Sequence, residues 1–179
     1  MPHTELLDLV NEKDEVVGTT TKEESHKKRL AHRIAVVLVF RDDSVLVNTR
    51  HDSKLLDHSV GGHVHKGESY KAAAAREAHE EIGLSITPEE LNLVETVLVS
   101  TQQYPNMVHW FGIFSIEAPE SFEPSPQEGE VDALHFEPIS EVEHDMRTRP
   151  QRYDAGFLVS LNAYLKQTRT QHDDITFSS

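Results

Sequence analysis

Three glutamates with helical spacing are the residues of this 179-residue chain whose types and positions most directly predict chemistry. Glu77, Glu80 and Glu81 are three and four positions apart, so their side chains share one face of a helix. Their mutual repulsion disfavours the helix unless a positive group lies beside them. Hard divalent cations such as Mg²⁺ take oxygen ligands of this kind. The three residues therefore predict a metal site.

The segment around the glutamates, residues 62–84, reads GHVHKGESYKAAAAREAHEEIGL. Clustered glutamates on their own are usually a solvated helix face, but here the flanking residues also have local roles. Gly61 and Gly62 let backbone carbonyls approach a cation, because no Cβ stands in the way. Glu68 and Ser69 supply negative charge and an N-terminal cap where a helix should begin, and Gly83 stands where a left-handed helix end belongs. The segment therefore predicts a loop, a helix and a glycine stop.

The same segment resembles the Nudix box, the signature of the Nudix superfamily. Gly62, Glu68 and the run from Arg76 to Leu84 match the box, and Ala78 is the one loose position, where the family prefers a bulkier aliphatic residue. Average residue usage makes a chance match of this pattern on the order of 10⁻⁸ per starting point. The resemblance implies binding of Mg²⁺ or Mn²⁺ by Glu77, Glu80 and Glu81.

The resemblance also implies roles for the neighbours of these ligands. The Gly61 carbonyl would assist in metal binding, and Glu68 and Arg76 would hold the helix and its charges in place. The general base stays open between the metal-binding glutamates Glu80 and Glu81 and a loop residue, Glu128. A solvated acidic loop is an equally good interpretation of the region around Glu128.

Residues 7–12, 17–19 and 31–33 resemble the N-terminal region of the isopentenyl-diphosphate isomerase branch of the superfamily. This raises an isomerase as the rival function. The isomerase has a catalytic cysteine where this chain has Gly61, and the chain contains no cysteine. The isomerase box is degenerate, whereas this chain keeps every box glutamate.

The resemblance therefore implies a hydrolase that cleaves a phosphoanhydride bond. Its substrate would be a nucleoside diphosphate linked to another moiety, or a related organic diphosphate. A regulatory nucleotide-binding module without catalysis is a third alternative, but such relatives usually lack box glutamates. Arg50 and Lys54 match diphosphate-contacting positions of the isomerase branch, and Arg33 is a weaker candidate. The alternative to a substrate-binding role is that these basic side chains are ordinary solvated residues of the protein surface.

Several histidines invite a metal interpretation that the sequence does not support. His58, His63 and His65 crowd the glycine loop, but their spacing fits no common structural zinc site. His26 and His32 resemble metal-binding histidines of the isomerase branch, yet the partner residues of that role are missing. The sequence therefore favours other roles for His58, His63 and His65, and it gives only weak support to a metal role for His26 and His32.

Composition limits the partners of the chain. Lys and Arg total 17 against 31 Asp and Glu, a formal charge of −14, which disfavours binding to nucleic acid or anionic membranes. The longest apolar run, residues 34–40, is too short to span a bilayer, and the first ten residues lack a signal-peptide pattern. We expect a cytoplasmic protein acting on a small molecule, with a homodimer, common in the family, as one option.

The helices and strands that position the candidate site residues are predicted from apolar runs and from helix-capping residues. Two apolar runs around residues 11–14 predict an N-terminal β-hairpin, and Thr21 with Glu24 predicts a capped helix after it. Further strands are expected over residues 34–40, 45–48, 93–100, 108–116 and 131–136, and further helices after Ser140 and over 153–166.

Strands flanked by helices predict the α/β class. The expected architecture is a three-layer α/β/α sandwich with a mixed central sheet, which is also the Nudix fold. We expect one domain over residues 1–167, including the hairpin, and a polar, mobile tail over 168–179.

Overall fold

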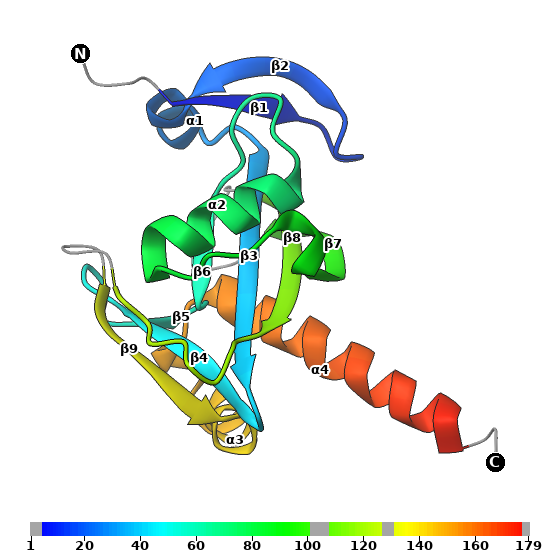
Figure 1. Cartoon of the computed structure of the whole chain (residues 1–179). Coiled ribbons are helices and arrows are strands. Elements are labelled where there is room, and N and C mark those ends of the chain that lie inside the picture. Colours follow the sequence, from blue (N-terminus) through cyan, green and yellow to red (C-terminus); the bar gives the residue numbers. More distant parts are fainter. Residues whose placement is uncertain (1–4, 101–107, 127–130, 177–179) are drawn as a thin grey trace.

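The computed structural model describes residues 5–100, 108–126 and 131–176, with side chains up to residue 170 (Figure 1). Its elements in chain order are β1 (Leu6–Val10), β2 (Val16–Thr21), α1 (Lys22–Lys28), β3 (His32–Arg41), β4 (Ser44–Arg50), β5 (Leu56–Asp57), β6 (Val60–His63), α2 (Tyr70–Ile82), η1 (Pro88–Glu90), β7 (Asn92–Ser100), β8 (Val108–Glu117), β9 (Val131–Pro138), α3 (Ile139–Thr148), η2 (Pro150–Arg152) and α4 (Ala155–Thr176).

A seven-stranded mixed sheet forms the centre of the fold. Its main path is β5-β4-β3-β8-β7, with β6 paired to β3 and β9 paired to β4. Strands β3 and β8 are parallel, and the other pairs are antiparallel. The β1–β2 hairpin forms a separate two-stranded sheet and lies with α1 at one end of the molecule (Figure 1). The mixed α/β class predicted from the sequence is confirmed.

Helices cover both faces of the sheet, because β3 is apolar on both sides. Ala35, Val37 and Val39 pack with the α2 side of the core. The alternate residues Val36 and Leu38 pack with α3 and α4 on the opposite face, as the two-residue period of a strand requires. Figure 1 shows α2 in front of β3 and α4 crossing behind it. The structure therefore has the three predicted layers.

The box helix α2 begins and ends where its caps predict. The Ser69 hydroxyl accepts a hydrogen bond from the Ala72 amide at 3.2 Å, and Gly83 ends the helix in the left-handed region at φ 73°. Ala73, Ala74 and Ala78 are fully buried against the sheet. These small side chains bring the helix close to β6 and β8, because only a methyl group separates its backbone from the strands.

Three features differ from the sequence prediction. Strands β5 and β6 were not expected, and β6 lies in the segment predicted to be a glycine loop. Helix α3 begins at Ile139 after Pro138, without the predicted side-chain cap from Ser140. Helix α4 runs to Thr176, so the predicted domain boundary at residue 167 lies inside a helix. None of the described helices is long and apolar enough to cross a lipid bilayer.

A glycine in β8 sets the distance between the box helix and the sheet. A Cβ on Gly112 would lie 2.4 Å from Cδ1 of Tyr70, the first residue of α2. We therefore expect Gly112→Ala to lower the free energy of unfolding by about 1–3 kcal/mol, the usual cost of overpacking. Chemical denaturation of both proteins measures the difference.

Gly18→Ala is the matched control, because its Cβ would meet only ordinary contacts, the nearest being Leu9 Cδ1 at 3.5 Å. We expect this variant to change stability by less than about 0.5 kcal/mol. Equal losses in the two variants would contradict the steric account.

Candidate functional site

A cavity of about 1290 Å³ opens on the sheet beside the box helix. Its floor is apolar and comes from three strands, with Ile34 and Val36 on β3, Val99 on β7 and Phe111 on β8. Carboxylates of α2 line one side, and polar residues around β4 and β5 line another. The cavity therefore joins an apolar surface to a strongly charged wall.

The acidic wall is organised by one arginine. Arg76 Nη1 donates to Glu77 Oε1 at 2.7 Å and to Glu80 Oε2 at 3.2 Å. Glu81 turns toward β6, where its Oε2 accepts a hydrogen bond from the Gly61 amide at 3.1 Å. All three predicted ligands and Gly61 line the cavity. The helix spacing read from the sequence therefore does bring these groups to one place.

Arg76 also ties the helix to the segment before it. Its Nε and Nη2 donate to the two carboxylate oxygens of Glu68 at 3.1 and 3.0 Å, and Nη2 donates to the His63 carbonyl at 2.9 Å. Burial opposes ionisation of Glu68, but hydrogen bonds from Arg76 and the His65 amide outweigh it and lower the pKa of Glu68. A two-pronged pair of this kind fixes direction as well as distance. The contacts therefore tie α2 to the segment before it, and the positioning roles of Glu68 and Arg76 stay a prediction.

Glu77 is the most buried of the three carboxylates, with only 9% of the residue exposed. A Cβ on Gly62 would lie 2.0 Å from its Cδ atom, so the carboxylate occupies space that only glycine leaves free. Burial raises the pKa of Glu77, although Arg76 partly opposes the shift. A buried carboxylate with a single cationic neighbour is costly. The donor set therefore fits a divalent cation, which would offset this cost.

The three box glutamates do not converge as tightly as bound ligands would. Among the described residues, the group whose ligand atoms all lie within 4.8 Å of one another consists of His26, His32 and His63. Arg76 lies between Glu77 and Glu80, while Glu81 is held at the Gly61 amide. Metal binding by the glutamates therefore requires small side-chain movements from this arrangement.

The predicted substrate-binding cations occupy different places. Arg50 lines the cavity and is held by Asp52 at 3.0 Å and Asp57 at 3.1 Å. Lys54 and Arg33 do not line it. Lys54 Nζ pairs with Asp132 at 2.5 Å, and Arg33 pairs with Asp14 of the hairpin turn at 2.6 Å.

Both of these cations therefore serve structural ion pairs here, which the sequence could not show because their partners are distant along the chain. Arg33 also lies over the Tyr70 ring, with its guanidinium carbon 5.4 Å from the ring centroid. Glu128, the predicted loop base, lies outside the described residues.

One arrangement in the cavity wall resembles a nucleophile with its base. His58 Nδ1 lies 2.7 Å from Asp57 Oδ1, and its Nε2 lies 2.9 Å from Ser160 Oγ. Ser160 is fully buried, and its hydroxyl bonds to the Gly156 carbonyl at 3.0 Å. No substrate can reach this hydroxyl, so the three residues fix the orientation of His58 and do not form a nucleophilic site.

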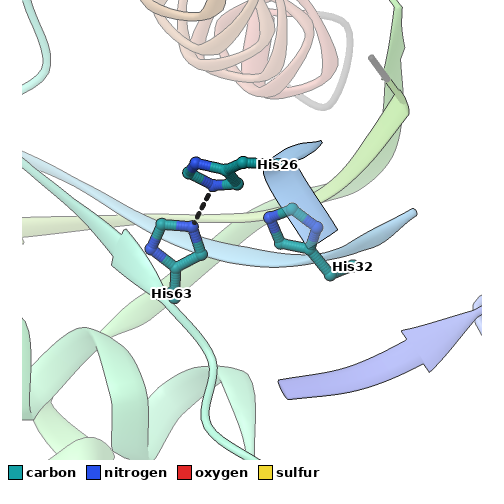
Figure 2. A group of neighbouring side chains, drawn as sticks. All are labelled: His26, His32 and His63. Carbon is teal, nitrogen blue, oxygen red and sulfur yellow. Dashed lines mark hydrogen bonds between the residues drawn. The ribbon is translucent and has the colours of Figure 1, made fainter. Parts of the chain in front are cut away.

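The structure brings together three histidines that the sequence analysis considered in two separate groups. His26 of α1, His32 of β3 and His63 of β6 point toward one another (Figure 2). Burial lowers the pKa of His32, and burial with nearby positive groups lowers the pKa of His63 to about 2. Spacing in the sequence could not reveal the cluster, because its members come from three elements. The sequence signals are the resemblance of His26 and His32 to histidines of the isomerase branch and the position of His32 on the strand face of Ile34 and Val36.

The low pKa of His63 predicts a stability that depends on pH. An unfolded histidine titrates near pH 6.5, so below that pH the unfolded chain binds a proton that the folded chain excludes. We therefore expect the free energy of unfolding to fall between about pH 6.5 and pH 5, by at most about 1.4 kcal/mol per pH unit for each such histidine. Denaturation across this pH range measures the slope.

The variant His63→Gln should show a shallower slope, whatever its absolute stability. The variant His144→Gln, which removes an exposed histidine of α3, should keep the wild-type slope. Parallel slopes for all three proteins would contradict a neutral, desolvated His63.

The chain is similar to known proteins over most of its length. A family model for the NUDIX domain matches residues 30–156. An uncharacterised Nudix hydrolase of Streptomyces coelicolor is 34% identical over 146 residues, which cover 78% of this chain and 77% of that protein. The Nudix hydrolase YfcD of Escherichia coli is 34% identical over 91 residues, and the match spans only 51% of its length.

The fold is also similar to that of solved structures. The crystal structure of DR0079 from Deinococcus radiodurans matches with a TM-score of 0.70 at 21% identity, covering 88% of this chain and 97% of that one. Identity at this level shows the fold alone. Since the family model and the Streptomyces relative both cover most of the sequence, the chain belongs to the Nudix hydrolase family.

Proposed function

We propose that this Nudix hydrolase cleaves the diphosphate linkage of a nucleoside diphosphate joined to another moiety, or of a related organic diphosphate, with Mg²⁺ or Mn²⁺. The observation that carries the proposal is the packing of Glu77 against Gly62, which places a desolvated carboxylate at the cavity wall. Glu80 and Glu81 extend this negative surface into the cavity. The negative charges of a diphosphate and of this surface repel each other. A divalent cation bound between them would allow the diphosphate to approach the glutamates.

The proposed ligands are Glu77, Glu80 and Glu81, with assistance from the Gly61 carbonyl. A divalent cation bound there would neutralise diphosphate oxygens, lower the pKa of an attacking water and support the leaving phosphate. Arg76 donates hydrogen bonds to Glu77 and Glu80 and thereby holds these two carboxylates at the cavity wall in the absence of a cation. Glu68 in turn fixes the guanidinium of Arg76. The protein therefore contributes a preset arrangement of charge.

The proton acceptor is proposed among residues with access to water. The Glu80 side chain is 53% exposed and has its described ion pair with Arg76 at 3.2 Å. Glu81 faces Gly61 across the cavity edge. We propose either residue as the acceptor of the proton from the attacking water, and Glu128 stays a proposal on sequence grounds.

Arg50 is the proposed contact for the substrate phosphates on the side away from α2. Its guanidinium is held by Asp52 and Asp57, and Asp52 is exposed, so a diphosphate could replace that carboxylate. The organic group of the substrate would lie on the apolar floor, which Phe111 and Val99 line. Lys54 and Arg33 are less suited to this role, because neither lines the cavity.

The wider proposals follow from composition and family. The substrate is a small molecule, and the charge of −14 disfavours nucleic acid and anionic membranes. A cytoplasmic location and a homodimer stay proposals. The isomerase alternative is disfavoured because Gly61 stands at the position of the isomerase cysteine and the chain has no cysteine.

A substrate panel with Mg²⁺ or Mn²⁺ tests the activity. It would contain ADP-ribose, dinucleotide polyphosphates, NADH, nucleotide sugars, nucleoside triphosphates and isopentenyl diphosphate. We expect metal-dependent release of phosphate or nucleoside monophosphate from at least one diphosphate, and a fall of roughly 100-fold or more in kcat for Glu81→Gln, equal to about 2.7 kcal/mol of barrier. Glu89→Gln, which neutralises an exposed carboxylate of η1, should retain activity.

Two other outcomes would redirect the assignment. Conversion of isopentenyl diphosphate to its allylic isomer would identify an isomerase that works without a cysteine. Tight nucleotide binding without turnover would identify a regulatory module.

The two glycines of β6 give a sharper steric test. A Cβ on Gly62 would overlap the Glu77 carboxylate, whereas a Cβ on Gly61 would meet only His58 Nδ1 at 3.7 Å. We expect Gly62→Ala to reduce kcat by roughly 100-fold or more, as misplacement of about 1 Å in a catalytic group can do. Gly61→Ala keeps the carbonyl and should lose much less. Equal kcat values for the two variants would argue against Glu77 as a ligand.

A further inference from the structure

Strand β1 of the N-terminal hairpin is paired with the turn that precedes the box helix. This box turn comprises residues 65–68. The Lys66 amide donates to the Leu6 carbonyl of β1 at 2.8 Å, and Leu7 forms a β-bridge with His65. Strand β1 precedes the segment matched by the family model, which begins at residue 30. The box turn is therefore held from outside that segment.

A buried carboxylate of β1 holds the centre of the box turn. Asp8 is 9% exposed, and its Oδ2 accepts a hydrogen bond from the Gly67 amide at 2.8 Å. Gly67 has a φ of 75°, the left-handed conformation that the third position of a type II turn requires. A buried carboxylate is costly unless it is hydrogen-bonded, and a bond from an amide to a charged oxygen is stronger than one between neutral groups. Asp8 therefore fixes the amide of the residue next to Glu68.

All four amides of the box turn have partners, and these partners define where Glu68 lies. Lys66 and Gly67 donate to β1. The Glu68 amide donates to the His65 carbonyl at 2.9 Å, and the His65 amide donates to Glu68 Oε2 at 3.0 Å. The Glu68 carboxylate also accepts two hydrogen bonds from Arg76. A shift of the box turn would therefore move Glu68 and the guanidinium that it holds.

The hairpin is itself anchored to the sheet through the turn between β1 and β2. In that turn, the Asn11 carbonyl accepts a hydrogen bond from Trp110 Nε1 of β8 at 2.9 Å, and Asp14 pairs with Arg33 of β3 at 2.6 Å. Asp14 Oδ2 also accepts a hydrogen bond at 3.1 Å from the hydroxyl of Tyr70, the first residue of α2. The hairpin therefore links the sheet to the box turn and to the beginning of the box helix.

We propose that Asp8 is a positioning residue for the acidic wall of the cavity. It holds the Gly67 amide, and the box turn then places Glu68 so that this carboxylate orients Arg76. Arg76 in turn holds two of the box carboxylates. The N-terminal hairpin is thus a working part of the site, although Asp8 does not line the cavity. The consequence for catalysis rests on the proposed hydrolysis, whereas the consequence for Arg76 does not.

Hydrogen exchange measured by NMR on the full chain, without metal or substrate, tests these contacts. Two signals report on them, the Gly67 amide and the Arg76 Nε–H, which donates to Glu68 Oε1 at 3.1 Å. In Asp8→Ala, we expect both to exchange about 10-fold faster or more, because local opening of the turn becomes easier. Asp8→Asn keeps an oxygen acceptor, and its exchange rates should stay within about threefold of the wild type.

Val10→Ala is the matched control within the same strand. Val10 is buried, but it pairs with Val16 of β2, and its amide donates to the Ala31 carbonyl. This variant should weaken the hairpin without changing the exchange of the Arg76 Nε–H. Unchanged Arg76 exchange in Asp8→Ala, or an equal increase in Val10→Ala, would overturn the proposal.

If Asp8→Ala does not fold, Asp8→Glu takes its place, because it keeps the charge and displaces the carboxylate by one methylene group. Faster exchange of the Arg76 Nε–H is again expected, and an unchanged rate would again overturn the proposal.

Kinetics provide a second readout with any substrate that the panel identifies. Asp8→Ala should lower kcat by about 10-fold and change KM by less than about twofold, since misplaced catalytic groups slow the reaction. Asp8→Asn should recover most of the loss. An effect on KM alone would contradict a positioning role. If the panel shows no hydrolysis, the exchange rates still decide whether Asp8 positions Arg76.

Discussion

The contact between the Glu77 carboxylate and the bare α-carbon of Gly62 is the constraint on which the site depends. It exists because α2 lies close to β6, and the buried alanines of the helix allow that approach. The carboxylate is thereby removed from water without a full complement of positive charge. Arg76 supplies one cation and shares it among Glu68, Glu77 and Glu80. The negative charge that Arg76 does not neutralise favours binding of a divalent cation at the cavity wall.

The cavity combines this charged wall with surfaces of other kinds. Its floor is apolar because Ile34 and Val36 of β3, with Val99 and Phe111, line it. Arg50 lies beyond the floor, on the side of β4. The cavity thus has a cation on the side of β4 opposite the acidic helix, an arrangement suited to a substrate with a diphosphate and an organic group.

Features that depend on nearby residues were predictable from the sequence. The caps at Ser69 and Gly83, the helical face of the glutamates and the alternation of β3 all follow from local chemistry. Strand β6 was not predictable in this way, because two of its four residues are glycines and its order comes from pairing with β3.

Contacts between segments distant along the chain could not be predicted from the sequence either. Arg33 is bound by Asp14 and Lys54 by Asp132, so cations that look available in the sequence are committed in the fold. The histidine cluster is the converse case, since residues without a joint pattern meet when the hairpin extension, β3 and β6 come together.

The most direct test of the central claim is to locate the divalent ion. Crystals grown with Mn²⁺ would be measured at a wavelength where manganese scatters anomalously. The account predicts an anomalous peak within coordination distance of Glu77 and at least one of Glu80 and Glu81. A peak elsewhere, with Glu77 still bound only by Arg76, would contradict it.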